Sequence, residues 1–392
     1  MKYKGIVISD LHFGAMDNVE FKKELSEIFL FHIMNMKKLD FLIIDGDYFD
    51  HKIYLNERTS DYAISFMAKL VDICKEFHCP IRCVYGTESH EVNQYNVFSI
   101  YEMDPEIDFK VVYMAEEEEL LKDLHVLYLP EEQLLDKDEY YRHFFQKKNY
   151  YDYIFGHGVI QEIMTDAMKH AKPAKEKKYK KVPYFTCGEL MYCCKGQVFF
   201  GHYHIPSSFE DKVFYVGSYS RWKHGEEDPK GFYELSCDTD KESYKQTFIE
   251  NSLAPKYVKF TYGYKDKAMN SDNDLIEELE KKDKLVKAKG IDYVMYVFNI
   301  PENHPNPESI ITILNERYRF NKSTKVQVVN GYIEKKKKIN KEKLNETIQK
   351  YPVVFDKNSK MEEKIVFFIK VKNDKDIELD VVKKHLYEEY KV

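Results

Sequence analysis

Short apolar runs alternate with longer stretches in which apolar side chains recur at helical spacing in the first part of the chain. Residues 5–8, 41–44 and 80–85 are predicted strands, because short apolar runs between polar turns are typical of buried strands. Residues 18–37 and 60–77 lie between these runs and place their apolar side chains on one helical face. This order predicts parallel strands covered by helices, which is the α/β class.

The pattern changes further along the chain. From 109 to 126 and from 197 to 232 the predicted strands are short and helices are few, as expected if a second sheet packs on the first. The acidic run 116–119 is predicted to begin a solvated helix, and the polar segment 238–245 is predicted to be a turn. We therefore expect three regions, which are a main domain at 1–235, a small α+β domain at 236–333 and a C-terminal segment at 334–392.

Several apolar runs end in residue types that bind metals. In chain order, these strand ends carry Asp10 and His12, then Asp47, then His90, then His157, and finally His202 and His204. Ligands of open α/β proteins gather outside the carboxyl ends of the strands, so we expect these ends to converge. Carboxylates and several histidines are sufficient to hold two divalent cations.

The roles of these side chains follow from their chemistry. Asp10 and His12 are expected to bind one cation, and Asp47 to bridge two, because a carboxylate has two oxygens. Two cations about 3.5–4 Å apart suit in-line displacement at phosphorus. His90 would protonate or stabilise the leaving oxygen. A mixed nitrogen and oxygen ligand set favours manganese or iron over magnesium.

Composition and charge restrict the partners. The formal net charge of −7 argues against a protein that holds nucleic acid through broad electrostatics alone. The basic run 170–181, which includes Lys178 and Lys180, is either a solvated loop or a contact for substrate phosphates. No run reaches the length of a membrane span, and the first residues enter a strand at once, so we expect a cytoplasmic protein without membrane contact. The seven cysteines lack a C-x-x-C pair and are expected to be reduced.

Four motifs in order resemble those of the calcineurin-like metallophosphoesterase superfamily. They are D-x-H at 10–12, G-D-x-x-D at 46–50, G-H at 156–157 and G-H-x-H at 201–204. The resemblance implies a four-layer α-β-β-α sandwich of two mixed sheets. It also implies two divalent cations, with Mn²⁺ foremost and Mg²⁺ or iron as alternatives. The implied ligands are Asp10, His12, Asp47, His157, His202 and His204, with His90 as the catalytic residue.

A narrower resemblance covers residues 214–222, 225–226 and 230–232. They are similar to the stretch that closes the phosphoesterase domain of SbcD-type DNA double-strand-break repair nuclease subunits, a group that includes phage recombination endonuclease subunits. This resemblance implies a manganese-dependent exonuclease and endonuclease at DNA ends, acting in the host cytoplasm if phage-encoded. It further implies a homodimer, a DNA-binding capping domain, and a C-terminal segment that binds an SbcC-like coiled-coil ATPase. Arg221, Lys178 and Lys180 are the expected substrate contacts.

The third motif departs from the family pattern. The superfamily has G-N-H there, with asparagine as a metal ligand, whereas residues 86–90 read G-T-E-S-H. Aligning the histidines puts Ser89 in the place of the asparagine, and Glu88 could substitute if the loop bulges. The ligand at this position stays open between the two.

Two other functions share this metal core. A phosphatase or small-molecule phosphodiesterase would use the same ligands, although the additional residues after 235 favour a macromolecular substrate. A non-catalytic scaffold, in which the altered third motif has abolished turnover, is the third alternative. Cleavage of DNA, cleavage of small esters only, or cleavage of neither distinguishes the three.

Overall fold

The computed structural model describes residues 1–329, apart from 17, 55, 133–135, 164–183, 225, 264, 301–303, 320 and 322, and also residues 363 and 366. The chain divides into two compact units, which are described separately. Unit 1 is Met1–Lys259 with Val286–Val294, and unit 2 is Phe260–Leu285 with the residues from Met295 onward. Lys178 and Lys180 lie outside the described residues, as does the predicted C-terminal segment except for two positions.

Unit 1 contains two six-stranded mixed sheets. The first has the order β14-β13-β1-β2-β3-β4, with parallel pairing from β1 to β4 and antiparallel pairing of β13 with its neighbours. Its strands are β1 (Lys2–Ile8), β2 (Phe41–Asp45), β3 (Ile81–Val84), β4 (Phe109–Val112), β13 (Gly231–Asp238) and β14 (Ser243–Glu250). The parallel strands therefore end at one edge, where polar residues follow β1, β2 and β3.

The second sheet has the order β11-β12-β10-β7-β6-β5. Its central strands β12, β10, β7 and β6 are parallel, while the edge strands β11 and β5 are antiparallel. Its strands are β5 (Glu116–Leu121), β6 (Leu124–Leu129), β7 (Tyr151–His157), β10 (Cys194–Gly201), β11 (Ser207–Phe209) and β12 (Val213–Tyr215). A separate pair joins β8 (Val159–Ile160) to β9 (Tyr184–Phe185).

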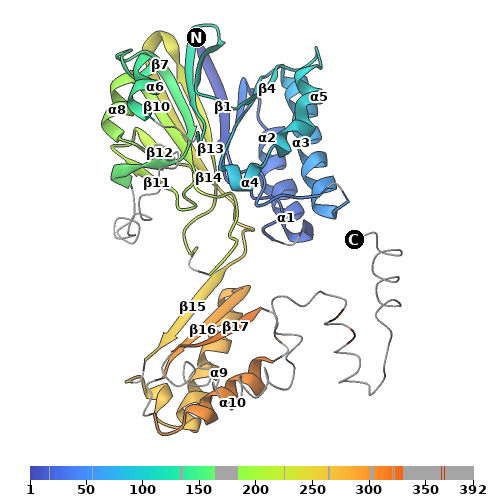
Figure 1. Ribbon diagram of the computed structural model, residues 1–392, viewed down its shortest axis with the longest axis vertical. Coiled ribbons are helices and arrows are strands. Elements are labelled where there is room, and N and C mark those ends of the chain that lie inside the picture. Colours follow the sequence, from blue (N-terminus) through green and yellow to red (C-terminus); the bar gives the residue numbers. More distant parts are fainter. Residues whose placement is uncertain are drawn as a thin grey trace. The chain divides into compact units, whose positions relative to one another are not determined.

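The alternation of side chains along each strand divides the core into layers. Val7 of β1 packs with Phe155 and Phe199 of the second sheet, so one apolar layer lies between the sheets. Ile6 and Ile8 face the opposite way, into a layer shared with the helices that precede and follow β2. A third layer covers the far face of the second sheet. Figure 1 shows α1–α5 on one side of the sheets and α6 and α8 on the other.

The helical segments have the following bounds. Those beside the first sheet are α1 (Asn18–Glu24), the π-helical η1 (Leu25–Leu30), α2 (Phe31–Met34), α3 (Arg58–Phe77), α4 (Glu88–Glu91), η2 (Gln94–Phe98) and α5 (Ser99–Glu102). Those beside the second sheet are α6 (Lys137–Phe145), η3 (Gln161–Ile163) and α8 (Cys187–Cys193), and η4 (Thr239–Lys241) joins β13 to β14. The predicted helices at 18–37 and 60–77 thus match helical segments of the structure.

One local prediction was wrong and another was right only in part. Glu116–Leu121 is the edge strand β5 and not the start of a helix, because its backbone pairs with β6 and its glutamates pair with basic side chains outside its own sheet. Glu118 pairs with Arg82, and Glu117 pairs with Lys147. The segment predicted as a turn at 238–245 does contain the short turn η4 at Thr239–Lys241, but its two ends belong to the paired strands β13 and β14. The predicted boundary after residue 235 therefore falls within β13, and the structure divides the chain later, after Lys259.

Unit 2 contains α9 (Asp272–Lys289) in part, α10 (Pro307–Tyr318) and the short helix η5 (Lys267–Met269). A three-stranded sheet has the order β15-β16-β17, and its strands are β15 (Tyr257–Tyr262), β16 (Tyr293–Asn299) and β17 (Thr324–Val329). The buried side chains Leu275, Leu279 and Leu314 come from its helices.

The predicted α/β class is confirmed at the level of two large mixed sheets with helices. Among the described residues, no helix is both long enough and apolar enough to cross a bilayer. All seven cysteines are buried and none is bridged.

A buried carboxyl at the end of α1 makes stability depend on pH. Glu24 is 2% exposed, and the Asn251 amide donates to its Oε2 at 2.6 Å. Burial raises the pKa of Glu24 from 4.5 to about 7, although hydrogen bonds from Ser220 and Asn251 lower it. Protonation of Glu24 stabilises the folded state. This contribution to the free energy of unfolding is complete below pH 4.5 and is lost as the pH rises through 7, because the folded state then holds a buried charge.

We expect Glu24→Gln to raise the free energy of unfolding at pH 8 by about 2–3 kcal/mol and to change it little at pH 4.5. Urea unfolding with a chelator present, at both pH values, measures this difference. Glu27→Gln, on the exposed face of the next helical turn, is the matched control. An equal effect of Glu24→Gln at both pH values would contradict the titration of Glu24.

Candidate metal centre

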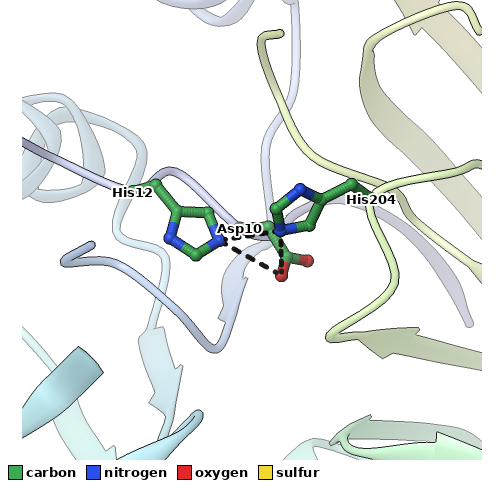
Figure 2. Close-up of side chains that lie close together, drawn as sticks. All are labelled: Asp10, His12 and His204. Atoms are coloured by element: carbon green, nitrogen blue, oxygen red, sulfur yellow. Dashed lines mark hydrogen bonds and ion pairs between the residues drawn. The ribbon is translucent and has the colours of Figure 1, made fainter. Parts of the chain in front are cut away.

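Three side chains from two strand ends form the first donor cluster. Asp10 and His12 follow β1, and His204 follows β10 (Figure 2). The Nε2 atoms of His12 and His204 are 3.0 Å apart, and each lies 3.8–3.9 Å from Oδ1 of Asp10. Asp10 and His12 are almost fully buried. Two imidazole nitrogens and a carboxylate therefore face one point.

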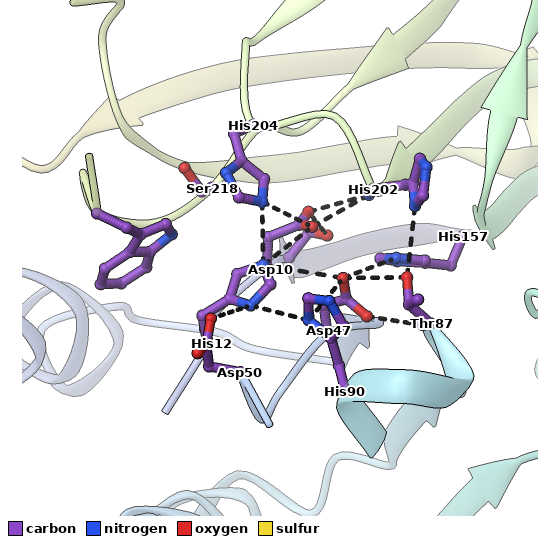
Figure 3. A network of polar contacts seen from close by, with 12 residues as sticks. Asp10, His12, Asp47, Asp50, Thr87, His90, His157, His202, His204 and Ser218 are labelled. Atoms are coloured by element: carbon purple, nitrogen blue, oxygen red, sulfur yellow. Dashed lines mark hydrogen bonds and ion pairs between the residues drawn. The ribbon is translucent and has the colours of Figure 1, made fainter. Parts of the chain in front are cut away.

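Asp47 lies between this cluster and a second one. Its Oδ2 is 3.8 Å from Nε2 of His12 and 3.3 Å from Nε2 of His157. Asp47, His157 and His202 form the second group of donor atoms. Figure 3 shows Asp47 in the middle of the network, with Asp10 on one side and His157 on the other. This is the arrangement required of a bridging carboxylate.

The backbone around these residues is strained. Asp10, His12, Asp47 and His202 all have positive φ, between 46° and 91°, a region that non-glycine residues rarely occupy. Hydrogen bonds between the loops hold this geometry, from Asp10 N to Gly46 O at 3.1 Å and from His12 N to Asp47 O at 3.0 Å. Strain of this kind collects at functional sites, where the surrounding fold maintains it.

Glycines in the motifs allow the close approach of His157. A Cβ at Gly46 would lie 2.0 Å from His157 Nδ1, and one at Gly201 would lie 2.6 Å from the same atom. The physical role of the glycine before Asp47 and before His202 is therefore to leave space for a neighbouring ligand.

Three of the histidines are oriented through the ring nitrogen that points away from the centre. His157 Nδ1 donates to Asp45 O at 2.9 Å, His204 Nδ1 lies 2.9 Å from Glu226 Oε1, and His12 Nδ1 lies 3.4 Å from Asp50 Oδ1. Partners of this kind fix the tautomer of metal-binding histidines, leaving the other nitrogen free to bind. His157 Nε2 is buried and has no hydrogen-bond partner within the described part of the chain, as expected for such an atom.

The third motif places Thr87 at the centre in place of Ser89. Thr87 precedes α4, its N–H donates to Asp47 Oδ1 at 2.7 Å, and its Oγ1 lies 3.3 Å from Asp47 Oδ2. Ser89 and Glu88 are exposed. Because α4 turns by about 100° per residue, Ser89 faces away from the side that Thr87 and His90 share. The structure thus corrects the assignment of Ser89.

His90 stands beside both clusters. Its Nδ1 lies 3.3 Å from His12 Nδ1 and 3.7 Å from Asp47 Oδ2, and its side chain is 30% exposed. Burial lowers the pKa of His90, and this effect together with the neighbouring His12 outweighs the opposite influence of Asp47. A histidine that is close to the centre and open to solvent can exchange a proton with a bound substrate.

The charge balance of the centre favours ionised carboxylates. Burial alone would raise the pKa of Asp47, but His157, His12 and His90 hold that pKa far below its ordinary value. Asp10 is also fully buried, and its contacts with His12, His157 and His204 lower its pKa to about 2. Both carboxylates are therefore available to a cation at neutral pH.

The donor set fits a pair of divalent cations. Donor atoms 2.0–2.2 Å from an ion, at right angles around it, are about 3 Å apart. The observed distances of 3.0 Å between His12 and His204 and 3.3 Å between His157 and Asp47 agree with this. The nitrogen and oxygen chemistry suits a borderline divalent metal.

Two buried glutamates near the centre were missed in the sequence. Glu131 follows β6 after Pro130, and Glu226 follows the 214–222 stretch. The apolar run that forms β6 ends in polar residues as the other site strands do, so this signal could have identified Glu131. Glu226 belongs to the 225–226 part of the narrower resemblance, but its contact with His204 arises only through the fold.

Arg221 does not face the donor clusters. Its buried guanidinium donates to the carbonyl of Asp228 at 2.7 Å and to that of Ala254 at 3.1 Å. These bonds fasten the loop after β12 to the segment after β14. The structure therefore corrects the predicted role of Arg221 in substrate binding and gives it a structural one.

No family model matches the chain, and no curated protein matches it. Among solved structures 49 chains match, and one crystal structure aligns over its whole length with 64% of this chain, at 14% identity and a TM-score of 0.34. A functional conclusion therefore has to rest on the geometry of the site itself.

Proposed function

We propose that this chain is a metal-dependent phosphodiesterase that cleaves DNA at its ends, and the nuclease subunit of an SbcCD-like complex. The observation that carries the proposal is the position of Asp47, whose Oδ2 lies within 3.8 Å of His12, His90 and His157. A carboxylate between two donor clusters, with a histidine at the open side, is what in-line displacement at phosphorus requires. The two facing mixed sheets support the finer assignment as a metallophosphoesterase sandwich.

The residues of the chain then have distinct tasks. Asp10, His12 and His204 would hold one cation, and His157 and His202 the other, with Asp47 shared. When bound, two such cations supply a nucleophilic hydroxide and neutralise the phosphate oxygens. His90 would hold a proton beside the leaving oxygen. Glu226, Asp50 and the Asp45 carbonyl keep the histidine rings in position.

A cavity beside the centre gives room for a substrate larger than phosphate. It has a volume of about 420 Å³, and its lining includes His202, His204, Tyr203, Ile205 and Lys223. The lining also includes Glu226, whose Oε1 lies 4.0 Å from Lys223 Nζ, and its aromatic and apolar walls are suited to a nucleoside next to its phosphate. This supports a nucleic-acid substrate over a small phosphomonoester.

The proposed assembly rests on the resemblance and on one surface feature. Three exposed apolar side chains follow the third motif and support a homodimer. They are Val92, Ile100 and Met103. A monomeric mass in light scattering at working concentration would argue against that dimer. The coiled-coil ATPase partner is proposed for residues 334–392.

Digestion of end-labelled linear duplex DNA tests the function. We expect shortening of the labelled strand with Mn²⁺ and none with a chelator, because both clusters need a cation to act. A nitrophenyl phosphate diester and a nitrophenyl monoester are assayed in parallel. Cleavage of the small esters alone would favour a phosphatase or small-molecule diesterase. Inactivity on every substrate, also with a coiled-coil ATPase and ATP, would favour the scaffold.

A further inference from the structure

A buried carboxylate that none of the four motifs includes contacts a member of the second donor cluster. Glu131 lies just beyond the end of β6, where its N–H donates to Tyr85 O at 3.1 Å. Its side chain is 6% exposed, and its Oε2 lies 3.1 Å from His202 Nδ1 and 3.2 Å from Thr87 Oγ1. A buried carboxylate is thus directed into the cluster.

Glu131 differs from Glu226 and Asp50, the carboxylates that orient histidine rings, in which ring nitrogen it contacts. Glu226 and Asp50 contact the ring nitrogens of His204 and His12 that point away from the centre. Glu131 contacts His202 Nδ1, and this same atom lies 3.4 Å from Thr87 Oγ1, which itself lies 3.3 Å from Asp47 Oδ2. Nδ1 is therefore the nitrogen of His202 that faces the second cluster, so Glu131 lies on the metal side of the ring.

The spacing of these atoms is that of neighbouring ligands on one ion. Donors at right angles around a divalent metal are about 3 Å apart. The contact of Glu131 Oε2 with His202 Nδ1 at 3.1 Å fits this value, as does the 3.3 Å between His157 Nε2 and Asp47 Oδ2. Thr87 offers only a hydroxyl, which is a weak donor to a divalent cation, so among the described residues the cluster has no fourth strong ligand apart from Glu131.

We propose that Glu131 is a direct ligand of the second cation, together with Asp47, His157 and His202. It supplies the oxygen that the altered third motif cannot, and it makes the second site one charge more negative than an asparagine would. The proposal rests on the two-metal part of the proposed function and not on DNA as the substrate. It accounts for a complete metal centre despite the sequence G-T-E-S-H.

Titration calorimetry with Mn²⁺, on chelator-treated protein without substrate, tests this ligand. We expect the wild type to bind two ions, and Glu131→Gln to weaken only one of them, by more than about a hundredfold. Glu132→Gln is the matched control, since this neighbouring carboxyl accepts hydrogen bonds from Tyr140 and Ala115. We expect it to bind both ions as the wild type does.

A second variant separates a ligand from an orienting residue. Thr87→Asn places an amide oxygen beside Asp47, so the double variant Thr87→Asn/Glu131→Gln should recover most of the lost affinity. Two tight sites in Glu131→Gln alone, or a loss that Thr87→Asn does not restore, would overturn the proposal. Thermal unfolding with chelator present checks that each variant is folded. Wild-type protein that binds two ions but leaves DNA intact would reject the nuclease and leave this ligand standing.

Discussion

Asp47→Asn is expected to abolish metal-dependent hydrolysis, with a loss of turnover on the order of a thousandfold or more. The Asp47 carboxylate lies within 3.8 Å of ring nitrogens from both clusters, so an amide in its place removes the shared anion from both. Calorimetry should show the loss of at least one bound Mn²⁺. Turnover is measured on the DNA and the nitrophenyl diester.

The matched control for this variant is Asp61→Asn, an exposed carboxylate on α3. It should retain wild-type turnover and metal binding. Wild-type activity in Asp47→Asn, with two bound ions, would remove the bridging role of Asp47 and the two-metal proposal with it.

His90→Ala is expected to lower turnover on DNA by about a hundredfold to ten-thousandfold while leaving both metals bound. His90 is outside the pair of ligand sets proposed for the two cations, and its partly exposed ring stands 3.7 Å from Asp47 Oδ2. Loss of a proton donor affects the departure of an alkoxide, which is a poor leaving group. Departure of nitrophenolate, which needs no proton, should be affected much less.

The ratio of the two losses is the decisive measurement. If His90 gives its proton to the leaving oxygen, the loss on DNA exceeds the loss on the nitrophenyl diester. An equal loss on both, with metal binding intact, would indicate that His90 positions the phosphate instead. His143→Ala provides the control, because His143 is an exposed residue of α6 and belongs to none of the donor clusters.

The main donor positions could be predicted from the sequence for a local reason. Asp10, His12, Asp47, His157 and His202 each follow an apolar strand, and parallel strands bring their carboxyl ends to one edge. Residues that are neighbours in the chain determine both that a segment forms a strand and where that strand ends. The same locality made the helix predicted at 60–77 recognisable from its apolar spacing, and α3 spans Arg58–Phe77 in the structure.

Positions that depend on pairing or on helical phase could not be predicted in this way. The acidic run at 116–119 becomes a strand because β6 offers an edge to pair with, and because Arg82 of the other sheet and Lys147 after α6 neutralise its glutamates. Thr87 takes the position expected for Ser89. Thr87 precedes the short helix α4 and faces Asp47, whereas Ser89 lies within the helix on the side that faces solvent.

The sequence by itself determined the class of fold and the donors delivered by strand ends, because both depend on contacts that recur at fixed spacing along the chain. Only the tertiary structure decided the roles of Arg221, Glu226 and Glu131. Each of them acts on a partner far away in the sequence: Arg221 on Ala254, Glu226 on His204, and Glu131 on His202. Such contacts depend on how the two sheets and their connecting loops pack together, and this packing cannot be predicted from the pattern of neighbouring residues in the sequence.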